Sequence, residues 1–189
     1  MRDNLAYQEE LREELIDGES VMMAPASTGH NSVAASIFSI FKVYLRRKKC
    51  VPFADGNVVF LTPKDRFIPD MMVVCDREKI QQDGIHGAPD LVVEVLSPST
   101  AKYDRRHKMK VYAECGVREF WIVDPSNKII EQYFQDGGTF AINGIYSDPP
   151  GWMMERMTEQ ARAAVQTHFK CSLFDDLDIA LEDIFDLEF

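Results

Sequence analysis

The sequence contains no long run of apolar residues, and no stretch approaches the roughly 20 residues that a helix needs to span a bilayer. Its first residues, MRDNLAYQEELREEL, are acidic and lack the basic start and apolar core of a secretory signal peptide. The content of 46% hydrophobic and 28% charged residues is ordinary for a globular protein. We therefore expect a soluble, cytoplasmic protein with no membrane partner.

Cysteine and histidine are also scarce, with four of each, and they form neither a CxxC pair nor a cluster at zinc-site spacing. This pattern predicts neither a disulfide framework nor a structural zinc ion. The cysteines are expected to be reduced residues of the core, and they are Cys50, Cys75, Cys115 and Cys171.

Positive charge is in deficit, since 21 Lys and Arg stand against 31 Asp and Glu and give a net charge of −10. A phosphate backbone rewards clustered cations, so this total argues at first against a nucleic-acid partner. However, residues 1–20 and 171–189 hold 14 of the 31 acids, which leaves 17 acids against 19 bases over residues 21–170. The middle of the chain therefore remains compatible with a polyanionic substrate.

Several stretches have helical character. Apolar residues recur at helical spacing from Asn31 to Lys49, with Asn31 as the expected cap and cations at the C-terminal end. Gly116 stands where a left-handed residue ends a helix. The other helices are expected over 1–15, over 101–115 and among the good helix formers of 153–169.

Six apolar runs, separated by Gly, Asp, Asn and Pro, are typical of strands. They are 57–61, 67–74, 89–96, 118–124, 129–135 and 139–147. Their order relative to the helices predicts an α/β fold with a mixed central sheet flanked by helices. We expect one domain over 1–189, in which 1–25 form an N-terminal helix and a hairpin with an Asp17-Gly18 turn, and 148–189 form a C-terminal extension packed on the core.

Carboxylates occur inside two of the apolar runs. Alternate side chains of a strand share a face, so Asp90 and Glu94 are expected to point the same way. Asp70 lies in the preceding run, FIPDMMVV, on a strand that can lie beside that of Glu94. A buried carboxylate is costly unless it is paired, hydrogen-bonded or bound to a metal. Two converging carboxylates would suit Mg²⁺, Mn²⁺ or Ca²⁺ better than zinc.

The helix expected after the Glu94 strand is rich in cations. Lys108 shares a helical face with Val111 and Tyr112, which are expected to pack on the sheet, so Lys108 is the cation predicted to point inward. Beside metal-binding acids, it would orient or deprotonate a water and stabilise charge on a phosphate. The remaining cations of this helix include Lys102, Arg105 and Arg106, which would contact nucleic acid.

A set of motifs, taken in order along the chain, resembles the Uma family of restriction endonuclease-like proteins, a branch of the PD-(D/E)xK nuclease superfamily. The resemblance covers most of the chain and is poorest over 148–170. The motifs are ELIDGE (14–19), His30, PD (69–70), PDLVVEVLSPST (89–100), DRRHKMKVY (104–112), GVREFWIVDP (116–125) and DIFD (183–186).

The resemblance implies a restriction-endonuclease-like core that hydrolyses DNA with Mg²⁺ or Mn²⁺. Asp70 and Glu94 would be its metal-binding acids, and the backbone carbonyl of Val95 would complete the protein ligands. The sequence departs from the superfamily pattern at Leu96, where a lysine is expected. The resemblance implies that Lys108 on the following helix takes this role.

Other interpretations stay open. Asp90 follows Pro89 and fits a turn-capping role better than metal binding, Glu14 is either an accessory acid of the site or an exposed residue, and His30 either bonds to backbone or lines the cleft. The acids and Lys108 also fit a structural ion-pair network in a non-catalytic binding module. The same metal site would alternatively serve RNA or another phosphate ester. A homodimer is expected because enzymes that cut both strands often present two sites.

Overall fold

The computed structural model describes residues 12–97 and 104–186 of the chain. The elements in order are β1 (Glu13–Ile16), β2 (Glu19–Met22), α1 (Thr28–Tyr44), β3 (Val51–Ala54), β4 (Val59–Thr62), β5 (Asp65–Phe67), β6 (Met71–Val74), β7 (Ile80–Gln81), β8 (Gly84–His86), β9 (Leu91–Val95), a π-helical turn η2 (Asp104–Lys108), α3 (Met109–Cys115), β10 (Glu119–Asp124), β11 (Ile129–Asp136), β12 (Thr139–Ser147), α4 (Gly151–Arg156), α5 (Glu159–Ala163), β13 (His168–Lys170) and β14 (Asp178–Ala180). A 3₁₀ turn, η1 (Arg77–Lys79), precedes β7.

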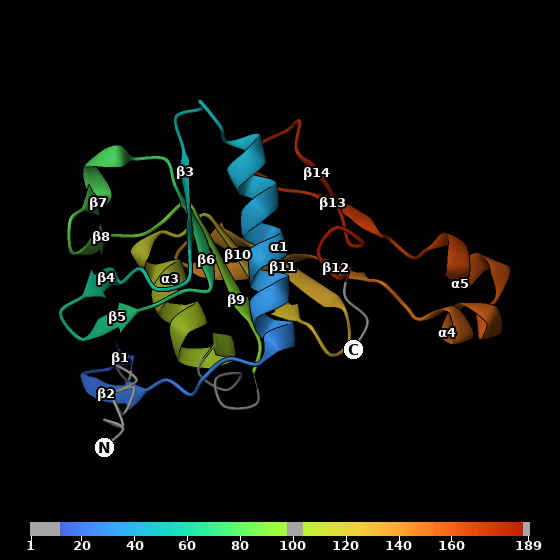
Figure 1. The fold of residues 1–189 in the computed structure, drawn as a ribbon, viewed down its shortest axis with the longest axis horizontal. Helices are drawn as coiled ribbons and strands as arrows, with labels where there is room; N and C mark the ends of the chain where they lie inside the picture. The colour runs from blue at the N-terminus through green and yellow to red at the C-terminus, as the bar shows by residue number, and fades with distance from the viewer. Residues whose placement is uncertain (1–11, 98–103, 187–189) are drawn as a thin grey trace, which may run out of the picture.

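The central sheet has six strands in the order β12-β11-β10-β9-β6-β3. It is mixed, because β9 and β10 are parallel whereas the other neighbouring pairs are antiparallel. A second six-stranded sheet, in the order β2-β1-β5-β4-β8-β7, lies to the left of the central sheet in Figure 1. The prediction of an α/β fold with a mixed central sheet is thus confirmed.

The two faces of the central sheet bury different elements. On β9 the side chains of Leu91, Val93 and Val95 join a core with α1, β13 and β14, whereas Val92 joins a core with α3 and the second sheet. This split follows from the two-residue period of a strand. Glu94 lies between Val93 and Val95, so its side chain belongs to the α3 face.

Helix α1 crosses the central sheet in front of it in Figure 1. It begins earlier than predicted, because the Ser27 hydroxyl, and not the Asn31 side chain, accepts a hydrogen bond from the backbone N–H of His30 at 3.2 Å. Its apolar stripe includes the fully buried Ile37 and Phe41. The helix predicted around 101–115 is confirmed over 104–115 and ends at Gly116 with φ +93°, while 101–103 lie outside the described residues.

The helix predicted over 1–15 is wrong in the part that the structure describes. Residues Glu13–Ile16 form β1, which pairs with β2 across the Asp17-Gly18 turn, so the predicted hairpin is confirmed. Helix formation among residues 153–169 is confirmed only in part, because α4 ends at Arg156 and α5 covers Glu159–Ala163. Thr158 caps a second helix, α5. Phe169 lies in strand β13 and packs against Trp121.

The C-terminal residues divide into two parts. Phe169, Leu181 and Ile184 belong to the core under α1. Helices α4 and α5 contain no buried residue and stand away from the body of the molecule at the right of Figure 1. No helix within the described ranges is long and apolar enough to cross a membrane.

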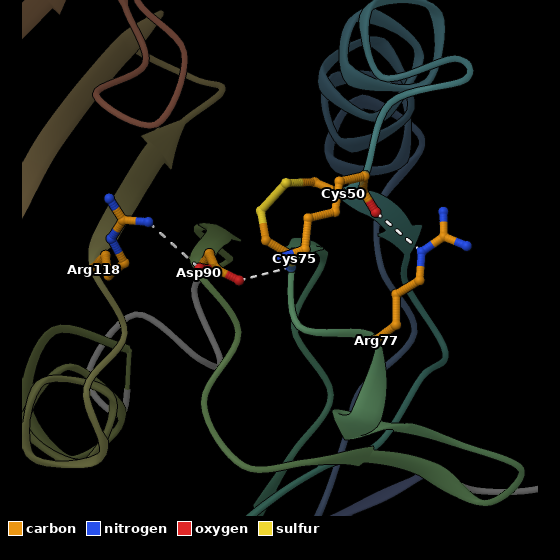
Figure 2. Close-up of a disulfide and its surroundings, with 6 residues drawn as sticks. Cys50, Cys75, Arg77, Asp90 and Arg118 are labelled. Carbon is orange, nitrogen blue, oxygen red and sulfur yellow. Dashed lines mark hydrogen bonds and ion pairs between the residues drawn. A yellow bond between two sulfur atoms is a disulfide. The ribbon is translucent and has the colours of Figure 1, made fainter.

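The prediction that all four cysteines are reduced is wrong, since Cys50 and Cys75 form a disulfide (Figure 2). The physical reason is a pairing that was missed because β3 was not predicted. Val51 of β3 lies opposite Val74 of β6, so the next pair along the ladder brings the two cysteines together. Cys115 and Cys171 remain free thiols.

Reduction of this disulfide is expected to lower the free energy of unfolding by about 3 kcal/mol, because the bond closes a loop with a sequence separation of 25 residues. Urea denaturation of the oxidised and reduced protein measures the difference, and Cys115→Ser serves as a control that leaves it unchanged. Alkylation of the unfolded, unreduced chain should modify two thiols. Modification of all four would contradict the bond.

Candidate functional site

Glu94, on the fourth position of β9, is the centre of a buried polar cluster. Only 3% of its surface is exposed, although it lies between two apolar neighbours of the strand. Its Oε1 accepts a hydrogen bond from the Tyr112 hydroxyl at 2.8 Å and one from Lys108 Nζ at 3.3 Å. Glu94 thus meets two donors from the helical segment that covers its face of the sheet.

Lys108 points inward, as its spacing from Val111 and Tyr112 predicts, and is 1% exposed. Its Nζ lies 2.9 Å from Glu14 Oε1 and 3.3 Å from both Glu94 Oε1 and Asp104 Oδ1. Asp104 comes from the same helical segment, one turn earlier, and Glu14 comes from β1. Three carboxylates therefore surround one ammonium group.

Glu14 joins the site through a second contact. Its Oε1 accepts a hydrogen bond from the backbone N–H of Ile68 at 2.7 Å, in the segment between β5 and β6. The pairing of β1 with β5 brings this glutamate to the cluster. Glu14 is therefore buried within the cluster, and the interpretation of Glu14 as an exposed residue is wrong.

Asp70 lies at the edge of the same cluster. Met71 pairs with Val93, so Asp70, one residue before β6, reaches the carboxyl end of β9, where its Oδ2 accepts the Val95 N–H at 2.7 Å. His30 Nε2 lies 3.3 Å from the same oxygen. The structure therefore places Asp70, Glu94 and the Val95 backbone at one end of two neighbouring strands.

The cluster carries more negative than positive charge. Burial raises the pKa of Glu94 well above its ordinary value, and although Lys108 lowers it, the charges of Asp104, Asp70 and Glu14 raise it further. Burial disfavours the charged form of Lys108, but the carboxylates of Glu94, Glu14 and Asp104 outweigh it and raise its pKa. Lys108 is therefore a permanent cation at neutral pH.

This charge surplus bears on whether a divalent cation fits. The described residues contain no group of three or more His, Cys, Asp and Glu side chains arranged to hold a metal ion. Magnesium, however, is commonly held by one or two carboxylates, with water and substrate phosphate as its remaining ligands. Asp70 and Glu94 supply two carboxylates at one end of neighbouring strands, and a divalent cation there would offset the surplus negative charge.

Asp90 is not part of this cluster. It lies at the other end of β9 from Glu94, about 13 Å along the strand. Its Oδ2 accepts the Cys75 N–H at 2.7 Å, and its Oδ1 lies 3.6 Å from Arg118 Nη1 (Figure 2). These contacts join the starts of β9 and β10 to the end of β6, so the structural interpretation of Asp90 fits its surroundings.

The three cations proposed to contact nucleic acid differ in their surroundings. Arg105 forms two hydrogen bonds to Glu131, at 2.7 and 2.9 Å. Arg106 is exposed, and Lys102 lies outside the described residues. Arg106 is therefore the more available of the two arginines.

Sequence reasoning placed Tyr112 only as a packing residue and missed its hydrogen bond to Glu94. The signal was present, because Tyr112 follows Lys108 by four residues and so shares its helical face. Asp104, four residues before Lys108, shares this face too, which accounts for its contact with Lys108 at 3.3 Å.

A cavity of about 500 Å³ lies at the start of α1. Its lining includes Ser27 and His30 at the start of α1, Ser126 and Lys128 in the β10–β11 turn, and Asp186 near the C-terminus. His30 both lines this cavity and contacts Asp70, so it links the cavity to the edge of the site.

The contact between His30 and Asp70 predicts a pH effect. Burial lowers the pKa of His30, but the hydrogen bond and the charge of Asp70 raise it above the ordinary 6.5. Its contribution to stability is therefore complete below pH 6.5 and is lost as the pH rises through the raised value. Asp70→Asn in the absence of metal removes the charge of Asp70, which raises the pKa of His30, so this pKa should fall below its wild-type value.

Histidine NMR titration in the presence of a chelator measures this change. His86, which lies 3.0 Å from Asp83 at the surface, is the internal control. An unchanged His30 titration in Asp70→Asn would contradict the ion pair.

Comparisons with known proteins agree with this architecture. The Uma2 family model, described as "Putative restriction endonuclease", matches residues 3–166. Two relatives come from Synechocystis: "Uncharacterized protein slr1290" is 29% identical over 150 residues, covering 76% of this chain and 79% of the relative. "Uncharacterized protein sll1609" is 25% identical over 130 residues, covering 67% of this chain and 73% of the relative.

One solved structure has the same fold. It is the crystal structure of a "putative nuclease belonging to DUF820" from Anabaena variabilis, with a TM-score of 0.71 at 16% identity. The match covers 94% of this chain and 91% of that chain. The predicted restriction-endonuclease-like core is confirmed by this likeness. Since the family model spans most of the sequence, the chain belongs to the Uma2 family of restriction endonuclease-like proteins.

Proposed function

We propose that this protein is a metal-dependent endonuclease that hydrolyses phosphodiester bonds of DNA. One observation carries the proposal: two carboxylates on neighbouring strands, Asp70 and Glu94, meet at one end of the sheet beside an inward lysine. Membership of the Uma2 family supports a nuclease in general. The metal dependence, the residue roles and the choice of DNA are proposals from the chemistry of the site.

Asp70, Glu94 and the Val95 carbonyl are proposed to hold Mg²⁺ or Mn²⁺. Such an ion, when bound, would polarise the scissile phosphate and lower the pKa of a bound water. The residues of the chain would fix the position of that ion, because Asp70 is held by the Val95 N–H and Glu94 by Tyr112 and Lys108.

Lys108 is proposed to act as a fixed positive charge. A general base must be unprotonated at the working pH so that it can accept a proton. The surrounding carboxylates raise the pKa of Lys108 and so favour its protonated form. Its ammonium group would therefore orient a water or stabilise charge that grows on the phosphate. Of the roles that the sequence suggested, orientation of the water and stabilisation of charge are favoured over deprotonation.

The substrate side of the proposal rests on exposed cations and the cavity near His30. Arg106, and Lys102 by its sequence position, would contact the phosphate backbone, whereas Arg105 is held by Glu131. One such core has little surface for reading a DNA sequence and only one site, which favours a homodimer for cutting both strands. RNA or another phosphate ester remains a second substrate class, which a substrate panel separates from DNA.

A non-catalytic binding module is the second candidate function. The observation that favours it is the enclosure of Lys108 by three buried carboxylates, which is also how a structural ion-pair network is built. In that case the site would bind no divalent cation.

Calorimetric titration with Mn²⁺ and cleavage of plasmid, single-stranded DNA and RNA test the proposal. Wild type should bind Mn²⁺ and cut DNA, and a chelator should abolish the cutting. Asp70→Asn should lose both, whereas Asp90→Asn, a matched carboxylate at the other end of β9, should retain Mn²⁺ binding. A wild type that binds no ion and cuts no substrate would overturn the nuclease proposal and leave the binding module.

A further inference from the structure

We propose that Tyr112 is a positioning residue, which holds Glu94 in the orientation that binds the divalent ion. This inference rests on the proposed function and extends it to a residue outside the acids and the lysine. It concerns the geometry of the Glu94 carboxylate and makes no claim that Tyr112 touches substrate.

The position of the Tyr112 hydroxyl is fixed by its ring. Tyr112 is fully buried on α3, and its ring lies edge-on to Phe67 at 5.3 Å and beside Phe120 at 5.5 Å between centroids. A tyrosine clamped by two aromatic rings has few alternative orientations. Its hydroxyl is therefore a pre-oriented donor, 2.8 Å from Glu94 Oε1.

The same helical face provides both donors to Glu94. Lys108 and Tyr112 are one turn apart, and both donate to Oε1, Lys108 from 3.3 Å. Neither of these bonds uses Oε2. A carboxylate held through one oxygen can present the other in a constant direction, which is what a metal ligand requires.

Lys108 alone would not fix the orientation of the Glu94 carboxylate, because it is shared with two other acids. Lys108 Nζ is shared among Glu14, Glu94 and Asp104, and its shortest contact, 2.9 Å, is with Glu14. The hydroxyl contact is the shorter of the two donor contacts to Glu94. Hydrogen-bond partners of a metal ligand typically change metal affinity by about 10- to 100-fold when removed.

The test compares Tyr112→Phe with a matched control, Tyr133→Phe. Both substitutions remove one hydroxyl and keep the ring, and Tyr133 also donates to a carboxylate, Glu131 Oε2, at 2.6 Å. Calorimetry with Mn²⁺ should show affinity about 10- to 100-fold weaker in Tyr112→Phe and unchanged in Tyr133→Phe. DNA cleavage by Tyr112→Phe at low Mn²⁺ should fall by a similar factor and recover at saturating Mn²⁺, with the KM for DNA unchanged.

Metal binding is also read as the rise in Tm that a fixed Mn²⁺ concentration gives to each variant. This second measurement needs only that the variant be folded below its own transition, so it remains decisive if Tyr112→Phe is less stable than wild type. A smaller rise than in wild type and Tyr133→Phe supports the inference.

The outcomes separate the two proposals. Equal Mn²⁺ affinity in wild type and Tyr112→Phe overturns the positioning role but leaves the metal site in place. A cleavage defect that saturating Mn²⁺ does not rescue also overturns it, because it would show an effect that does not act through the ion. A wild type that binds no Mn²⁺ overturns the positioning role together with the proposed function.

Discussion

Replacing Lys108 by methionine is expected to lower the free energy of unfolding by about 3–5 kcal/mol at pH 7, the usual cost of removing one partner of a buried ion pair. Methionine retains the aliphatic part of the side chain but lacks the ammonium nitrogen, which lies 5.7 Å from the centroid of the Phe67 ring. What is lost is the cation between three buried carboxylates. The remaining negative charges would then repel one another at low local dielectric constant.

The pH dependence of this loss gives its cause. Lys108 is the neighbour that lowers the pKa of Glu94, which burial raises well above the ordinary value. Without Lys108 that pKa rises further, so folding takes up a proton on Glu94 and is favoured at low pH. The deficit of Lys108→Met relative to wild type should therefore shrink as the pH falls toward the ordinary pKa of glutamate.

Urea denaturation of both proteins between pH 7 and pH 5, in the presence of a chelator, measures these effects. Lys110→Met is the matched control, because Lys110 lies two residues further along the helix in an exposed pair with Glu114 at 3.7 Å. Its effect should be within about 1 kcal/mol and should not depend on pH. Equal stability of Lys108→Met and wild type at pH 7 would show that the cation does not hold the carboxylates together.

The part of the site that local periodicity defines could be predicted from the sequence. Glu94 alternates with valines of one strand, and Lys108 lies on the same helical face as Tyr112, so one strand and one helix suffice to place them. The position of Asp70 also followed, since its strand was expected next to that of Glu94. These residues were found because their spacing within single elements carries the information.

Glu14 and the disulfide depend on pairings between distant segments. Glu14 reaches Lys108 because β1 pairs with β5, and the cysteines meet because β3 pairs with β6. Neither pairing has a periodic signal, and β3, with the sequence VPFA, contains a proline that weakens its strand pattern. Helix propensity likewise failed near Phe169, because packing against Trp121 outweighs it.

Glu94→Gln is expected to abolish metal-dependent activity without loss of stability. Glutamine keeps the oxygen that accepts hydrogen bonds from Tyr112 and Lys108 but removes the negative charge. Losing a partner of a metal ligand costs about 10- to 100-fold in affinity, so losing a proposed ligand should weaken Mn²⁺ binding by at least about 100-fold. Cleavage should fall with it at every Mn²⁺ concentration that the assay can reach.

The stability of this variant in the presence of a chelator should equal or exceed that of wild type. Lys108 keeps Glu14 and Asp104 as partners in this variant, so its charge stays paired. Burial and the neighbouring carboxylates raise the pKa of Glu94 although Lys108 lowers it, so the ionised form of Glu94 weakens the fold as the pH rises, and a neutral amide avoids this effect. A gain in Tm together with loss of Mn²⁺ binding would show that the Glu94 carboxylate binds metal and does not stabilise the fold.

Glu131→Gln provides a control of opposite sign. Glu131 also receives a tyrosine hydroxyl and a cation, but the hydrogen bonds of Arg105 are the main reason that its pKa is lowered. Its ionised form therefore stabilises the fold above the ordinary pKa of glutamate, and the amide should lower Tm at pH 7 while Mn²⁺ binding is retained. If Glu94→Gln instead behaves like Glu131→Gln, with lower Tm and normal Mn²⁺ binding, then Glu94 is a structural partner of Lys108. The same substitution at two tyrosine-bonded glutamates thus distinguishes an acid that binds metal from one that only holds the fold.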